Sequence, residues 1–235
     1  MAEKQIKKLK VVLLCGGKGT RLRPITESIP KPLVKLNGKS VLEYLMNSLA
    51  AQGLTSFVVC TGYKAEMVES EVNSFAKKDW KINFVNSGEE ASILKRIIDA
   101  SKFCGDNFIV CYGDAVADID MNKVLKIHQK NNALVTNVLY RMESPFGLME
   151  TKDDFVVDYK EKPILPFWFN IGFFIFEQSA LTLARDDNWI EFLKKLVLAK
   201  KMCALKHTGQ HITFNTEPEK KEAEEKIKAF SYVFE

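Results

Sequence analysis

The stretch that decides the fold class is Leu9-Lys-Val-Val-Leu-Leu14, followed at once by Cys15-Gly-Gly-Lys-Gly-Thr-Arg21. The first segment is a largely apolar run of strand length. The second is a glycine-rich loop, in which three glycines in four positions allow close backbone approach, so that successive N–H groups can point at phosphate oxygens. A strand that ends in such a loop is typical of an open α/β sheet, where ligands bind beyond the carboxyl ends of the strands.

Short apolar runs and helical patterns alternate after this loop, which indicates a parallel sheet wound with helices. Ser40 and Glu43 form a capping box ahead of one of these helices. We predict strands over 56–61, 81–85 and 108–112, and helices over 41–52, 64–75 and 91–103. Gly113 and Asp114 directly follow the last of these strands, so they and the glycine loop should lie at the same edge of the sheet.

The pattern changes after Asp120, which we expect to cap a helix over 121–130. The segments that follow are strand-like with polar turns between them, at 133–141, 146–151, 155–160 and 169–176. An amphipathic helix over 189–200, two short strands and a terminal helix complete the chain. The predicted fold is therefore α/β, with a Rossmann-like, mostly parallel mixed sheet flanked by helices and a small β-rich extension lobe.

Composition excludes several classes of protein. Among 235 residues, 46% are hydrophobic and 27% charged, as in ordinary globular proteins. The net charge of +4 is spread along the chain without the interleaved basic and aromatic residues of a nucleic-acid groove, so we expect no nucleic-acid partner. No stretch approaches a membrane span, and we expect no membrane partner. Five cysteines without a CxxC pair favour a reducing, cytoplasmic location.

The glycine loop alone does not identify the ligand. It lacks the Lys-Ser/Thr ending of a Walker A loop and the three spaced glycines of a dinucleotide fingerprint. Arg21 adds a planar guanidinium group, whose several N–H hydrogen-bond donors suit the oxygens of a polyphosphate. Taken by itself, the loop is as consistent with an ordinary flexible turn as with a phosphate site.

The wider sequence favours the phosphate site. The stretch Gly16-Gly-Lys-Gly-Thr-Arg-Leu-Arg-Pro-Ile-Thr26, followed by Pro30-Lys-Pro-Leu33, resembles the signature of sugar-phosphate nucleotidylyltransferases. Further segments fall in that family's order: Cys60–Lys64, Leu94–Arg96, Gly113–Asp118, Glu161–Pro163, Asn170–Gly172, His207–Gly209 and Asn215–Thr216. The resemblance covers nearly the whole chain and looks closest to the glucose-1-phosphate cytidylyltransferase branch.

The resemblance implies an enzyme that transfers a nucleotidyl group, with CTP as the expected donor, to a sugar 1-phosphate and releases pyrophosphate. Mg²⁺ is the implied cofactor, and a homo-oligomer is left open. We expect residues 1–235 to form a single nucleotidyltransferase domain, in which 1–130 is the nucleotide-binding half and 131–235 the acceptor-binding half.

The family's functional positions carry over onto matching residues here. Those that match its nucleotide-binding positions are Leu14, Gly16, Gly17, Gly19, Thr20, Arg21, Lys31, Gly113 and Asp114. Those that match its acceptor-binding positions are Gly147, Glu161, Lys162 and Asn170. The implied catalytic cations are Arg21, Lys31 and Lys162, which would neutralise the transferring phosphates. Arg21 and Lys31 follow a flexible loop and do not belong to the periodic apolar pattern of a buried helix or strand. We therefore expect that removing either side chain opens no cavity in the core.

Asp114 matches the carboxylate that holds Mg²⁺, whereas Asn215 stands where the family commonly has a second metal-binding aspartate. A second departure is Glu90-Ala-Ser-Ile-Leu94, where the branch has a Thr-Gly-Gly-Arg-Leu-like segment. These departures keep two alternatives open: a non-sugar alcohol or polyol phosphate as acceptor, and a catalytically silent nucleotide-binding regulatory relative. His207 and His211 are interpreted as solvated or capping residues rather than metal ligands.

Overall fold

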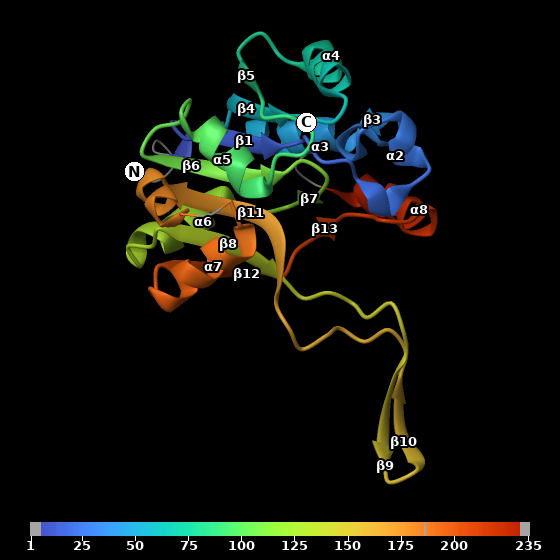
Figure 1. Cartoon of the computed structure of the whole chain (residues 1–235). Coiled ribbons are helices and arrows are strands. Elements are labelled where there is room, and N and C mark those ends of the chain that lie inside the picture. Colours follow the sequence, from blue (N-terminus) through green and yellow to red (C-terminus); the bar gives the residue numbers. More distant parts are fainter. Residues whose placement is uncertain (1–5, 186, 231–235) are drawn as a thin grey trace.

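A seven-stranded mixed sheet forms the body of the molecule in the computed structural model, which describes residues 6–185 and 187–230 (Figure 1). In spatial order its strands are β12 (Met202–His207), β8 (Val135–Tyr140), β11 (Phe169–Glu177), β6 (Asn107–Tyr112), β1 (Lys10–Leu14), β4 (Ser56–Thr61) and β5 (Lys81–Asn86). The neighbours of β11 run antiparallel to it and the remaining pairs are parallel. The predicted fold class is confirmed.

Helices cover both faces of this sheet because successive strand residues point to opposite sides. In β1, Val11 and Leu13 belong to one buried cluster and Val12 to the other. The first cluster packs against α3 (Val41–Ala51), α4 (Ala65–Phe75) and α6 (Met121–Lys130). The second packs against α5 (Ile93–Ser101) and α7 (Trp189–Leu198). The result is a three-layer sandwich with the sheet in the middle.

Local signals set the ends of these helices. Ser40 accepts a hydrogen bond from Glu43 N at 3.2 Å, and Asp120 caps α6, as predicted. The predicted helix over 91–103 is shorter, because Ser92 caps it and α5 begins at Ile93. Near the end of the chain, Ala223, Ile227 and Phe230 are buried.

Short elements connect the larger ones. The short helices are η1 (Thr20–Leu22), α2 (Ile25–Ser28), η2 (Lys31–Leu33), η3 (Gln178–Leu183) and η4 (Ile227–Ala229), and α8 covers Glu217–Lys226. Two small ladders pair β2 (Lys35–Leu36) with β3 (Lys39–Ser40), and β7 (Val116–Ala117) with β13 (His211–Ile212). The β7–β13 ladder brings the end of the chain beside the loop that follows β6.

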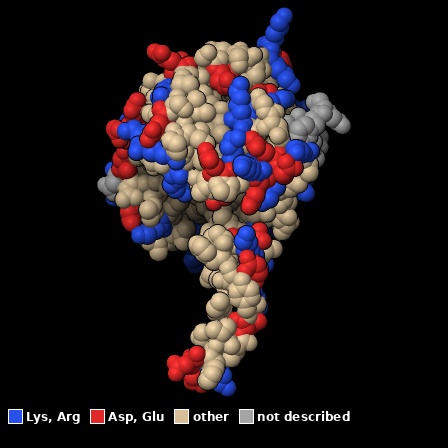
Figure 2. All heavy atoms as spheres, turned by 90° about the vertical axis from the view of Figure 1, so that its right-hand side faces the viewer, with Lys and Arg blue, Asp and Glu red and all other residues tan. Residues whose placement is uncertain are grey.

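A two-stranded ribbon leaves the body between β8 and β11. Its strands are β9 (Leu148–Lys152) and β10 (Phe155–Lys160), and every residue of both is exposed. The segment 141–168, hereafter the arm, projects from the body in two perpendicular views (Figures 1 and 2). The predicted β-rich extension is therefore a protruding hairpin.

Candidate active site

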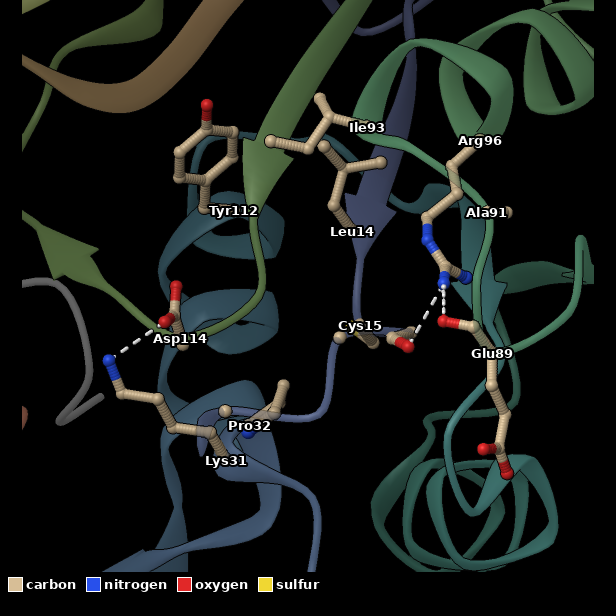
Figure 3. A pocket seen from close by; sticks show the side chains of 13 residues that line it. Leu14, Cys15, Lys31, Pro32, Glu89, Ala91, Ile93, Arg96, Tyr112 and Asp114 are labelled. Carbon is tan, nitrogen blue, oxygen red and sulfur yellow. Dashed lines mark hydrogen bonds and ion pairs between the residues drawn. The ribbon is translucent and has the colours of Figure 1, made fainter. Parts of the chain in front are cut away.

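A cavity of about 220 Å³ opens at the carboxyl ends of β1 and β6, where the strand pattern predicted a site (Figure 3). Its lining comprises Leu14, Cys15, Gly16, Gly17, Gly19, Lys31, Pro32, Glu89, Ala91, Ile93, Arg96, Tyr112 and Asp114. Six of the nine predicted nucleotide-binding residues are in this set. Gly113 lies just beneath it: its N donates to Leu14 O at 3.1 Å, and a Cβ there would meet Cys15 Sγ at 2.6 Å.

The buried cysteines at and near the cavity pack rather than react. Burial raises the pKa of Cys15 well above its usual value, and raises that of Cys60 to about 12. Both thiols therefore stay protonated near neutral pH and act as small apolar groups. Catalysis by a cysteine nucleophile has no support in this arrangement.

Arg96 organises the loops around the cavity, and no role was predicted for it. Its guanidinium donates to Thr61 O at 2.7 Å, Gly88 O at 2.8 Å, and Gly16 O and Glu89 O at 3.1 Å (Figure 3). Only 4% of this residue is exposed, and burial lowers its pKa. One side chain thus joins the glycine loop, the end of β4 and the 88–89 turn.

The guanidinium also explains two glycines. A Cβ at Gly16 would lie 1.9 Å from Arg96 Nη1, and one at Gly62 would lie 2.5 Å from it. Gly16 therefore makes room for a buried cation besides exposing its backbone. The sequence signal for Arg96 was a charged residue beside Ile97 and Leu94 on the inward face of a helix.

Lys31 is the central cation of the cavity. Its Nζ lies 2.8 Å from Asp114 Oδ2 and 3.2 Å from Asn215 Oδ1, and it stands 5.8 Å from the centre of the Phe214 ring. The expectation that its removal opens no cavity is wrong, since Lys31 is only 6% exposed. Lys31 begins the short helix η2, whose other two residues, Pro32 and Leu33, are buried as well.

The two predicted metal residues meet at this lysine. The β7–β13 ladder carries Asn215 to Asp114, and Thr213 Oγ1 donates to Asp114 O at 3.4 Å. One carboxylate and one amide oxygen are oxygen donors of the kind that Mg²⁺ accepts, provided that substrate phosphates complete its shell. Within residues 6–185 and 187–230, no group of three or more His, Cys, Asp or Glu side chains could hold a metal.

The two histidines near the end of the chain are not solvated, which corrects the interpretation from sequence. His207 Nε2 lies 2.8 Å from Asp118 Oδ1, and its side chain is only 10% exposed. Burial, followed by the neighbouring His207, lowers the pKa of His211 to about 4. Both rings pack against Tyr140.

The outer side of the glycine loop is exposed and carries a lysine in ion pairs. Thr20 and Arg21 lie on η1 and are exposed, outside the cavity lining. Lys18 Nζ forms an ion pair with Glu90 and lies 3.9 Å from Glu89 Oε2. These contacts join the glycine loop to segment 90–94, which differs from the related branch. Arg21 is therefore exposed to solvent, two residues beyond Gly19 of the cavity lining.

The predicted acceptor-binding residues divide into two groups. Asn170, at the start of β11, accepts from Gly172 N at 2.8 Å, and a Cβ at Gly172 would lie 2.4 Å from the ring of Tyr112, so this end of β11 borders the cavity. Gly147, Glu161 and Lys162 instead lie on the arm. Glu161 and Lys162 are exposed, and the structure does not bring them to the cavity of their own chain.

A mostly parallel sheet that gathers a glycine-rich loop, a lysine and an aspartate at its carboxyl edge is typical of nucleotide-handling α/β enzymes. The chain belongs to the nucleotidyl transferase family, whose profile matches residues 10–203. Its relatives place it among the sugar-phosphate nucleotidyltransferases. No helix in the described part of the chain has the length and apolar character needed to cross a membrane.

Individual relatives show how far this similarity extends. The chain is 30% identical over 226 residues to a Bacillus subtilis protein named as a probable glucose-1-phosphate cytidylyltransferase, covering 86% of this chain and 89% of that protein. It is 30% identical over 194 residues to a UTP–glucose-1-phosphate uridylyltransferase of Synechocystis, covering 74% of this chain and 50% of that protein. The crystal structure of HddC from Yersinia pseudotuberculosis matches with a TM-score of 0.74 and 25% identity, covering 93% of this chain and 99% of that one.

Proposed function

We propose that this enzyme transfers the cytidylyl group of CTP to a sugar 1-phosphate and releases pyrophosphate. One observation carries the choice of base: the glucose-1-phosphate cytidylyltransferase relative is matched over 89% of its length, whereas the uridylyltransferase is matched over half. The cavity at the glycine loop supports a nucleotide there, because its backbone amides and Lys31 suit phosphate oxygens.

The reaction needs positioning and charge neutralisation rather than a covalent enzyme intermediate. A phosphate oxygen of the acceptor attacks the α-phosphorus of the nucleotide, the new P–O bond forms, and the bond to the departing pyrophosphate breaks in line. That oxygen is already ionised near neutral pH, so no general base is required. Lys31 and Arg21 would neutralise the triphosphate and its leaving group, and Lys162 would hold the acceptor phosphate.

Asp114 and Asn215 are the residues that would hold Mg²⁺ beside Lys31. The ion would supply Lewis-acid stabilisation of the phosphate charge. Lys31 and Asp114 form an ion pair, which compensates both charges in a partly buried place. Lys31 would bind the phosphates, and Asp114 would offer a carboxylate oxygen to the cation.

A non-sugar alcohol or polyol phosphate is the second candidate acceptor. Ala91 and Ile93, from the segment where the related branch carries glycines and an arginine, line the cavity with apolar side chains. A smaller polar surface there favours an acceptor with fewer hydroxyl groups than a hexose 1-phosphate, such as a glycerol phosphate. The catalytically silent alternative depends on Asn215 and on the glycines that segment 90–94 lacks.

Pyrophosphate release across four nucleoside triphosphates and a panel of phosphorylated acceptors tests these proposals. We expect turnover with CTP and glucose 1-phosphate or a related hexose 1-phosphate. Equal or faster turnover with GTP, UTP or dTTP would reject CTP as the nucleotide donor. Turnover only with glycerol or ribitol phosphates would select the second acceptor class, and no turnover with any pair would select the silent relative.

A further inference from the structure

The end of the chain reaches the cavity through the β7–β13 ladder, which has only two residue pairs. His211 pairs with Ala117, and Ile212 pairs with Val116. A ladder this short has few backbone hydrogen bonds with which to resist a slip of register. A slip of one residue moves a strand by about 3.3 Å, which is enough to break a side-chain hydrogen bond. Contacts beside the ladder therefore matter for its register.

Asp118, the residue after β7, holds both ends of the turn that precedes β13. Its Oδ1 lies 2.8 Å from His207 Nε2 and accepts a hydrogen bond from Gln210 N at 2.6 Å. Asp118 N in turn donates to Gln210 O at 3.2 Å. Because a carboxylate oxygen can only accept, His207 Nε2 carries a hydrogen. Asp118, His207 and Gln210 are hereafter the clasp.

The clasp is shielded from water and closely fitted. Only 10% of the His207 side chain and 24% of the Asp118 side chain are exposed. The His207 ring packs on Tyr140, with 6.0 Å between the ring centroids. A Cβ at Gly209 would lie 2.4 Å from Asp118 Oδ1, so the turn approaches the carboxylate where it has no side chain. A shielded carboxylate with two donors makes a stronger contact than an exposed ion pair.

The other end of the same ladder meets the cavity. Thr213 Oγ1 donates to Asp114 O at 3.4 Å. Lys31 Nζ donates to Asn215 Oδ1 at 3.2 Å. The clasp and these contacts lie at opposite ends of one short ladder, so both sets form together in a single register. A slip of β13 along β7 would carry Asn215 away from Lys31.

We propose that the clasp positions Asn215: the contact between Asp118 and His207 fixes the register of the β7–β13 ladder and so holds Asn215 at the cavity. Neither clasp side chain belongs to the cavity lining, so both act through the ladder. The metal role of Asn215 rests on the proposed function, whereas the register does not. Groups that orient a metal ligand from behind typically change metal affinity by about 10-fold to 100-fold.

Hydrogen–deuterium exchange tests the register without metal or substrate. His207→Leu keeps an apolar side chain against Tyr140 but removes the donor to Asp118. Amide exchange over residues 210–216 should accelerate by at least about tenfold, because the ladder opens more often. His207→Gln, whose amide N–H can replace the Nε2 hydrogen, should restore most of the protection.

A buried histidine elsewhere in the fold supplies the matched control. His128 is 3% exposed and contacts Thr136 Oγ1 at 2.9 Å, outside the ladder. His128→Leu should leave exchange over residues 210–216 at the parent rate. Parent-like exchange in His207→Leu, or an equal acceleration in His128→Leu, would overturn the role of the clasp.

Manganese binding tests whether the clasp positions residue 215 for a metal. Mn²⁺ is titrated into the protein without nucleotide, and the free ion is measured by electron paramagnetic resonance. Asn215→Asp should tighten Mn²⁺ binding by about tenfold in the parent and in His207→Gln, but by less than about twofold in His207→Leu. A full tenfold gain in the His207→Leu background would overturn the positioning role.

Failure of the proposed function gives a different result. If Asn215→Asp does not tighten Mn²⁺ binding even in the parent background, residue 215 is not at the metal. The proposed metal role of Asn215 is then overturned, while the exchange measurement still decides whether the clasp fixes the ladder.

Discussion

Lys31 Nζ lies 2.8 Å from Asp114 Oδ2, so the cation expected to bind phosphate and the carboxylate expected to bind metal are partners in the same partly buried ion pair. Asn215 Oδ1 is the third member at 3.2 Å. A change at any of the three alters the electrostatic environment of the other two, because charges at this distance in a partly buried site interact by several kcal/mol. Variants here must therefore be compared with volume-matched replacements.

Lys31→Met should lower turnover by about a hundredfold to a thousandfold, the usual cost of removing one preorganised charge donor. Methionine keeps the contact with Phe214, so most of the packing remains. Steady-state kinetics and thermal unfolding should be measured together. Near-parent turnover in Lys31→Met would place the phosphates elsewhere.

Arg96→Met should destabilise the fold by about 3 kcal/mol, because four carbonyl oxygens around the cavity lose a charged donor. The melting temperature should fall by about 10 °C. The KM for the nucleotide should rise as the glycine loop loosens, and Arg96→Lys should recover only part of the loss. The neighbouring Lys95→Met is the control, since Lys95 pairs with Asp99 on the exposed side of α5 and should leave KM unchanged.

Asn215→Asp should lower the magnesium concentration for half-maximal activity by about tenfold, which is well within the Coulomb energy of a unit charge pair near 4 Å. The new carboxylate would face the place where Asp114 and Lys31 meet. Magnesium titration of pyrophosphate release measures the midpoint, and Asp114→Asn should abolish activity. An unchanged midpoint would remove residue 215 from the metal site.

His211 should make the fold sensitive to acid. Its pKa of about 4 lies below the usual unfolded value near 6.5, so the unfolded state binds the proton first as pH falls. Its contribution to stability is therefore complete above about pH 6.5 and declines as pH falls toward 4. Between pH 7 and pH 4.5 the parent should lose about 2–3 kcal/mol more than His211→Gln. Urea unfolding at both pH values measures this difference, and equal losses would contradict it.

Much of the molecule was predictable because its signals are local. The alternation of Val11, Val12 and Leu13 indicates a strand buried on both faces, and Ser40 marks a helix start through one hydrogen bond. The position of Asp114 directly after β6 places it at the carboxyl edge from chain order alone. Arg96 was missed as a site residue because its four partners come from loops separated from it by 7 to 80 positions.

The sequence by itself determined the class of fold, the edge of the sheet at which the site lies and the family whose motifs the chain carries, since these depend on periodicity and on residues adjacent in the chain. Only the tertiary structure decided that Lys31 is buried against Asp114 and Asn215, and that Lys162 lies on an arm away from the cavity of its own chain. Burial and the direction of a hairpin depend on which surfaces meet in space, and spacing along the chain carries no record of that.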